Sequence, residues 1–285
     1  MNETYRPALD QLPIEAVVAL LVDAEARVVP ALRRATPELA KAATVLAGAI
    51  KGGGRLVFVG AGTSGRLAAA EAAELPGTFG VAAARCRAVL AGEGAEVVDD
   101  AVEDDAAAGA AGVRALGLDP GDVVVAVAAS GRTPFTLGAA AEARAAGAGV
   151  VAVVNAPGSP LAALADAAVE LVVGNEVLRG STRLTAGTAQ KVALNALTTA
   201  AMANAGHVHG DLMIDVVPAN TKLRQRAAGI VADIAGCAGD TAAAALDACG
   251  GNTRAAVLHL VRGLPHGDAV RLAEAHRSLR AALDA

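Results

Sequence analysis

Apolar and polar positions along this chain form short blocks that predict strands and helices in regular succession. Apolar runs rich in valine, such as LVFVG at 56–60 and VVVAVAA at 123–129, end in turns of Gly and Ser, which is typical of buried strands. Strands are expected at 55–60, 87–91, 122–129, 149–154 and 167–173. This alternation predicts an α/β fold, a doubly wound parallel sheet of about five strands with flanking helices.

Helical patterns fill the intervals between these strands and both ends of the chain. Helices are expected at 64–75, where Pro76 should stop the helix, at 93–116, 134–146 and 181–205, and within 215–235 after a corner at 216–218. The pattern divides the chain into an N-terminal helical segment that packs on the core (1–50), an α/β core (51–230) and a small, alanine-rich helical C-terminal region (231–285).

Composition and charge narrow the class of protein. The chain is 54% hydrophobic and carries a formal net charge of −5, which argues against a nucleic-acid-binding protein because these usually show a basic face. Cys86, Cys237 and Cys249 have no metal-ligand spacing and predict reduced thiols. Residues 1–7 do not form a secretion signal, and no apolar run is long enough for a membrane span. We therefore expect a cytoplasmic protein.

Two turns rich in hydroxyls follow expected strands. The first contains Gly62, Thr63, Ser64 and Gly65, and the second contains Ser130, Gly131, Arg132 and Thr133. In a doubly wound sheet, ligands bind beyond the carboxyl ends of the strands, where turn N–H groups and helix N-termini accept anions. Both turns therefore predict an anion site. The alternative is that some of these hydroxyls only cap helices and that Arg66 and Arg132 pair with glutamate side chains instead of a ligand.

Four blocks in this order carry a family resemblance: GAGTSGR at 60–66, AASGRTPF at 128–135, GSTRLTAGTAQK at 180–191 and DLMIDVVPANTKLRQRA at 211–227. Over residues 30–230 the sequence resembles the N-acetylmuramic acid 6-phosphate etherases of the sugar isomerase (SIS) fold superfamily, and its tail resembles their C-terminal region. The resemblance implies a sugar-phosphate-binding core, a lyase of peptidoglycan recycling, a homodimer, and no metal or organic cofactor. It also implies that the third block, with Glu176, Ser181, Thr182 and Arg183, lines the pocket.

The implied reaction removes D-lactate from C3 of a phosphorylated amino sugar and leaves N-acetylglucosamine 6-phosphate. The C2 proton of the open-chain sugar lies beside the C1 aldehyde, so a carboxylate can remove it; lactate then leaves and water adds at C3. By resemblance, Glu74 is one catalytic carboxylate, provisionally the acid for the lactyl oxygen. Without the resemblance, a glutamate near a helix end is usually a solvated surface residue.

The second carboxylate depends on how a gap is placed in AVEDDA at 101–106. With three missing residues before Glu103, Glu103 occupies the position of the second catalytic glutamate; without that gap the position falls on Ala106. The flanking residues favour Glu103, and Asp104 and Asp105 are neighbouring alternatives. The bland interpretation is a solvated acidic helix face. Thr185 stands where the family commonly has lysine.

Two other functions fit the same fold. One is a regulator that binds a sugar phosphate without turning it over, and the other is an aldose–ketose isomerase, which shares the base chemistry at C2. The block at 180–191 counts against the isomerase. His207 and His209 lie close together, but no further ligand completes a set, so no metal is expected.

Overall fold

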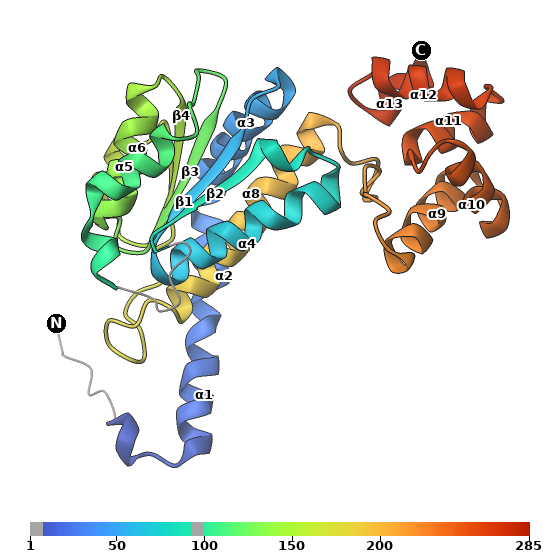
Figure 1. Ribbon diagram of the computed structural model, residues 1–285. Helices are drawn as coiled ribbons and strands as arrows, with labels where there is room; N and C mark the ends of the chain where they lie inside the picture. Colours follow the sequence, from blue (N-terminus) through green and yellow to red (C-terminus); the bar gives the residue numbers. More distant parts are fainter. Residues whose placement is uncertain (1–7, 93–99) are drawn as a thin grey trace.

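The computed structural model describes residues 8–92 and 100–285 (Figure 1). The leader prediction for 1–7 and the first part of the helix predicted at 93–116 lie outside these residues. A five-stranded parallel sheet forms the centre, in the order β2-β1-β3-β4-β5. Its strands are β1 (Leu56–Gly60), β2 (Cys86–Leu90), β3 (Val123–Ala128), β4 (Gly149–Val154) and β5 (Ala167–Glu170). The predicted fold class and the five strand positions are confirmed, with differences of at most a few residues at strand ends.

Helices cover both faces of this sheet (Figure 1). The side chains of β1, β3 and β4 alternate between two hydrophobic cores, one shared with α3, α4 and α8 and the other with α5, α6 and α7. The bounds are α3 (Thr36–Gly52), α4 (Gly62–Phe79), α5 (Ala106–Arg114), α6 (Pro134–Ala145), α7 (Pro160–Leu164) and α8 (Thr185–Ala205). Strands buried on both faces explain why the sequence shows continuous apolar runs.

The strand order reverses beside β1. The chain passes from β1 to β2 on one side and then returns to β3 on the other, so β1 and β3 are neighbours that pair from Leu56–Val123 to Gly60–Val127. Both predicted anion turns follow these two strands. They therefore lie at the topological switch point, the usual ligand position in such sheets.

Helix α4 is longer than predicted, because Pro76 does not stop it. The helix runs on to Phe79, and Gly80, with φ +66°, ends it by donating its N–H to the carbonyl of Pro76 at 3.0 Å. A proline inside a helix removes one backbone hydrogen bond. Here Leu75 and Phe79 on either side are buried in the core, and this packing holds the last turn in place.

The helices predicted at 93–116 and 181–205 are shorter in the structure. The described part of 93–116 contains a 3₁₀ turn, η4 (Asp100–Asp104), and then α5, whose first turn Asp105 caps by accepting from the N–H of Ala108. Helix α8 begins at Thr185. Helix α9 (Thr221–Ala235) begins after Asn220, whose side chain accepts from the N–H of Leu223. Helix α9 thus begins after the predicted corner at 216–218, where Pro218 disfavours helix in the residue before it.

The N-terminal segment has two parts. Helix α2 (Val28–Arg34) contacts α8, and α3 contacts both α8 and the sheet. Helix α1 (Ile14–Ala24), together with the 3₁₀ turns η1 (Leu9–Gln11) and η2 (Glu25–Arg27), extends away from the sheet, and none of the α1 residues is buried (Figure 1). Within the N-terminal segment, α2 and α3 thus contribute buried residues, whereas α1 does not.

The C-terminal helices have a hydrophobic core of their own, made of residues between Ile214 and Ala282. They are α9, α10 (Gly239–Ala248), α11 (Thr253–Arg262), α12 (His266–Ala275) and α13 (Leu279–Asp284). Helix α9 contributes Ala227, Ile230 and Val231 to this core. In the described residues no single helix has the length and hydropathy of a membrane span; α9 and α10 pass that test only as a pair bent by 110°.

Candidate active site

The turn between β1 and α4 is held in a tight shape by two glycines. A Cβ on Gly65 would lie 2.6 Å from the carbonyl oxygen of Gly60, and a Cβ on Gly60 would lie 2.8 Å from the Cα and N of Gly65. Gly62 has φ +53°, in the region that favours glycine. The helix therefore begins close against the strand, and Thr63 and Ser64 occupy its half-buried first turn.

Glu103 lies against this first turn. A Cβ on Gly62 would be 2.6 Å from Oε1 of Glu103, so the carboxylate stands directly over the start of α4. A carboxylate is stabilised there because the helix N-terminus carries partial positive charge. Glu103 thus belongs to the same end of the sheet as the first predicted turn, and is not a solvated residue remote from it. Asp105 caps α5 instead, and Asp104 is exposed.

The second turn, between β3 and α6, also depends on a glycine. Gly131 has φ +59°, and a Cβ there would lie 2.2 Å from Oγ of Ser159. The N–H of Arg132 donates to Oγ of Ser130 at 3.1 Å, and both side chains are exposed. Thr133 directly precedes α6 and is half-buried. Exposed donors on a fixed turn at the switch point suit an anionic ligand.

Hydrogen bonds join the first turn to α8 and to the loop after β4. Oγ of Ser64 donates to Oε1 of Gln190 at 2.9 Å, and Nε2 of Gln190 donates to Oδ1 of Asn155 at 2.9 Å. Asn155 in turn donates to the carbonyl of Leu171 after β5. Sequence reasoning singled out Ser64 but missed the part of Asn155. Its position directly after a predicted strand was the available signal.

The third sequence block approaches the same turn through Gly187. A Cβ on Gly187 would lie 3.6 Å from Cγ2 of Thr63. Before α8 begins, Ser181 is half-buried, while Thr182 and Arg183 are exposed. The structure therefore brings the start of α8 to the loop after β1, with polar side chains of the block on the accessible side.

Glu176 and Thr185 have structural contacts. The two carboxylate oxygens of Glu176 accept from the backbone N–H groups of Thr185 (3.1 Å) and Ala186 (2.9 Å), so this buried glutamate caps α8. Oγ1 of Thr185 is buried and donates to Glu25 at 3.3 Å. The side chain of Thr185, at the position where the resemblance implies lysine, therefore points into the protein, toward Glu25 in η2.

Glu74 lies near the other end of α4, and its side chain is 65% exposed. It follows Ser64 by ten residues on a continuous helix, which at about 1.5 Å per residue corresponds to about 15 Å along the axis. Oε2 of Glu74 is 3.7 Å from Nζ of Lys191 on α8. Within one chain, Glu103 therefore stands over the first turn of α4, whereas Glu74 lies about 15 Å along the helix axis from Ser64.

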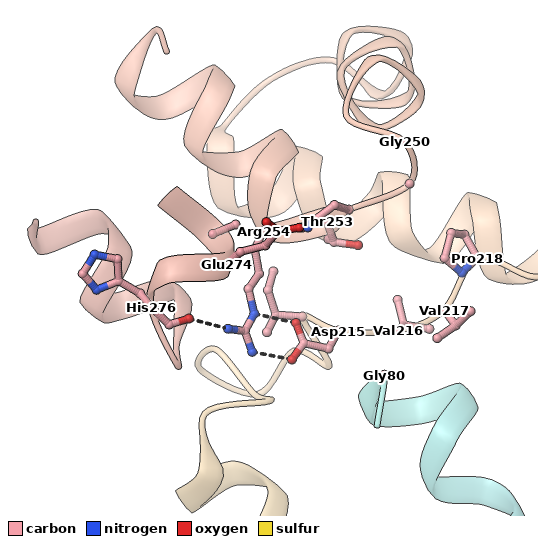
Figure 2. Close-up of a pocket in the computed structure, with 14 residues that line it drawn as sticks. Gly80, Asp215, Val216, Val217, Pro218, Gly250, Thr253, Arg254, Glu274 and His276 are labelled. Carbon is pink, nitrogen blue, oxygen red and sulfur yellow. Dashed lines mark hydrogen bonds and ion pairs between the residues drawn. The ribbon is translucent and has the colours of Figure 1, made fainter. Parts of the chain in front are cut away.

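A separate cavity of about 480 Å³ lies between the end of α4 and the C-terminal helices (Figure 2). Gly80, Pro218 and His276 line it, and its wall includes the ion pair of Asp215 with Arg254. Asp215 also contacts His207, at 2.7 Å from Nδ1. None of the sequence-predicted site residues lines this cavity, and Arg254 of its half-buried ion pair also donates to the carbonyl of Gly206, directly after α8.

Sequence comparisons show which known proteins this chain is similar to. The SIS domain model matches residues 22–155. The chain is 45% identical to the N-acetylmuramic acid 6-phosphate etherase of Deinococcus radiodurans over 93% of its length and 88% of that protein. It is 41% identical to the etherase of Edwardsiella ictaluri over 100% of its length and 97% of that protein.

Solved structures support the fold. The phosphoheptose isomerase of Francisella tularensis is similar with a TM-score of 0.52 and 20% identity, covering 69% of this chain and 99% of that one. At 20% identity, this likeness shows the fold. Because the etherases match nearly the whole chain at more than 40% identity, this chain belongs to the N-acetylmuramic acid 6-phosphate etherase family.

Proposed function

We propose that this chain is a lyase that cleaves the D-lactyl ether of N-acetylmuramic acid 6-phosphate to give N-acetylglucosamine 6-phosphate and D-lactate. The observation that carries the proposal is the similarity to etherases over nearly the full chain. The activity would serve peptidoglycan recycling. A cytoplasmic location agrees with the three free cysteines.

The chemistry assigns work to each part of the site. The two turns after β1 and β3, with Thr63, Ser64, Ser130 and Thr133, would hold the phosphate through hydroxyls and N–H groups. One glutamate removes the C2 proton of the open-chain sugar, and the other gives a proton to the lactyl oxygen as lactate leaves C3. Water then adds at C3 of the unsaturated aldehyde. Each acid–base group contributes roughly 10²- to 10⁴-fold.

The length of α4 bears on how two glutamates reach one sugar. Glu103 stands over Gly62 in the anion turn after β1, whereas Glu74 lies about 15 Å along the helix axis from Ser64 in the same turn. The phosphate and C3 of a hexose 6-phosphate are only a few bonds apart, too close to span that distance. We therefore infer that one site combines Glu103 of one copy with Glu74 of a second copy.

The exposed face of α4 fits such a homodimer. Arg66, Ala70, Ala73, Glu74 and Gly77 form this face. Small side chains at its centre allow close approach of two helices, and a twofold axis beside Ala70 would bring Arg66 of one copy opposite Glu74 of the other. The same dimer would explain the exposed stripe of Ile14, Val18 and Val22 on α1.

Purified protein incubated with N-acetylmuramic acid 6-phosphate is expected to release D-lactate. Saturable phosphosugar binding without lactate would instead identify a regulator, and conversion between aldose and ketose phosphates without lactate would identify an isomerase. Either result, obtained with folded protein, would contradict the proposal.

Mixing two inactive variants tests the shared site. Glu74→Gln and Glu103→Gln should each be inactive alone. After the two are mixed and allowed to exchange subunits, half of the dimers are mixed, and each has one site with both glutamates, so about one quarter of wild-type activity should return. No recovery in proven mixed dimers would show that each chain builds its own site.

A further inference from the structure

Four side chains form a polar cluster where α4 packs against α8. Glu71 and Glu74 come from α4, and Lys191 and Thr198 come from α8. Nζ of Lys191 is 2.9 Å from Oε2 of Glu71 and 3.7 Å from Oε2 of Glu74. Oγ1 of Thr198 donates to the other oxygen of Glu71 at 2.6 Å. The cluster lies outside the two anion turns.

Glu71 anchors the lysine. Its side chain is 4% exposed, and both of its oxygens have a partner, so this buried carboxylate is not left unsatisfied. Burial lowers the pKa of Lys191, but hydrogen bonding and attraction to Glu71, with a smaller contribution from Glu74, outweigh burial and raise the pKa above its usual value. The ammonium group is therefore charged, and its ion pair with the buried Glu71 carboxylate holds it in place.

Glu74 lies on the accessible side of the same ammonium group. Because it follows Glu71 by three residues on α4, the two carboxylates share one face of the helix and would repel each other without a cation between them. Lys191 occupies that position. A largely exposed glutamate has many rotamers, and a fixed cation 3.7 Å away selects those in which the carboxylate turns toward α8.

We propose that Lys191 is a positioning residue for Glu74: Glu71 and Thr198 fix its ammonium group, which aims the Glu74 carboxylate that enters the catalytic site. The inference rests on the proposed function, since it assigns Lys191 a role only through Glu74. In this proposal Glu71, which is buried and does not itself reach the surface, holds the Lys191 ammonium group in place.

Lys191→Met tests this role. With Glu74 no longer aimed, kcat for lactate release should fall about 10- to 100-fold, since small misplacements of reacting groups have effects of this order. KM should change little, because the phosphate turns are untouched. Lys191→Arg, which keeps the charge, should restore part of kcat. Lys51→Met is the matched control: Lys51 also donates to a partner on α8, Asn204, at 2.7 Å, but has no contact with Glu74.

Removing Lys191 leaves Glu71 buried without its cation, and this alone can unfold the protein. The double variant Glu71→Gln/Lys191→Met removes both charges and keeps a hydrogen-bonding group for Thr198. It should fold with near-wild-type melting temperature and show the same loss of kcat. A folded double variant with wild-type kcat would overturn the inference.

A double-mutant cycle separates positioning from a general structural effect. In the Glu74→Gln background, Lys191→Met should cause no further loss of the residual rate, because the group through which Lys191 acts is already gone. An equal loss in both backgrounds would reject the positioning role while leaving the etherase activity intact. If Glu74→Gln itself had wild-type kcat, the catalytic role of Glu74 would be wrong, and with it the role of Lys191.

Discussion

At the scale of single residues, the loop after β1 depends on backbones that approach too closely for side chains. Gly65 faces the carbonyl of Gly60, and the shape of this turn sets where Thr63 and Ser64 present their hydroxyls. The neighbouring carboxylate of Glu103 stands over Gly62. These close contacts at Gly60, Gly62 and Gly65 leave the turn little freedom for substitution.

Gly65→Ala should therefore impair both stability and activity. The new Cβ would lie 2.6 Å from backbone atoms of Gly60 that have no flexible end to move, and overpacking of this kind costs about 1–3 kcal/mol. Gly48→Ala is the control, because that helical position has nothing within 4 Å of an added Cβ. It should be neutral or stabilising by about 0.5–1 kcal/mol. Urea unfolding and lactate release measure the two effects; equal behaviour of both variants would contradict the close contact.

The residues of the site could be predicted only where chemistry is local in sequence. Turn hydroxyls after strands, and Glu103 by resemblance, were identified from the sequence. The bonds from Ser64 to Gln190 and from Gln190 to Asn155 join positions 126 and 35 residues apart. Such partners are set by how helices cross in space. The capping role of Glu176 was missed for the same reason, since helix α8 begins nine residues later at Thr185.

At the scale of elements, one ion pair fastens β1 to β3 at their amino ends. Asp122 accepts from the N–H and guanidinium of Arg55 and from the N–H of Asp119. Burial raises the pKa of Asp122, but the hydrogen bonds from Arg55 and the two backbone N–H groups outweigh burial and hold the pKa below its usual value. The pair thus fixes the register of the two strands that position both anion turns.

Asp122→Asn is expected to lower the free energy of unfolding by about 2–3 kcal/mol at pH 7. A depressed pKa in the folded state means that the stabilisation is complete above the ordinary aspartate pKa, near 4, and is lost as pH falls through the folded value. The difference between wild type and variant should therefore shrink below about pH 4. Asp233→Asn, on the exposed face of α9, is the control; a difference independent of pH would contradict this origin.

Elements were predicted well where periodicity is strong. The predicted runs identified the five strands of the described residues; those of β1, β3 and β4 are continuous and apolar because these strands are buried on both faces. Helix ends were predicted less well. Local rules stop a helix at Pro76, but burial of Leu75 and Phe79 carries α4 past it. Conversely, residues 181–184 were expected to be helical and remain outside α8.

At the scale of the whole molecule, α1 is an apolar helix with no buried residue in the described part of the chain. Ile14, Val18 and Val22 are 74%, 53% and 64% exposed and recur every four residues, so they form one stripe. If this stripe packs on a second copy, Val18→Asp should convert the dimer to a monomer in sedimentation experiments and reduce activity with it. Val261→Asp, at a similarly exposed position on α11, should leave the dimer intact. A dimer unaffected by Val18→Asp would exclude α1 from the interface.

The strand order has a consequence for the sequence of events in folding. Because β1 lies between β2 and β3, its second edge stays unpaired until the chain has made β2, η4 and α5 and returned. The C-terminal helices instead pack mainly on their sequence neighbours, α9 with α10 and α11, and α11 with α12. Local contacts form faster than distant ones. The helical tail can therefore mature while the sheet, and with it the anion turns, is still assembling.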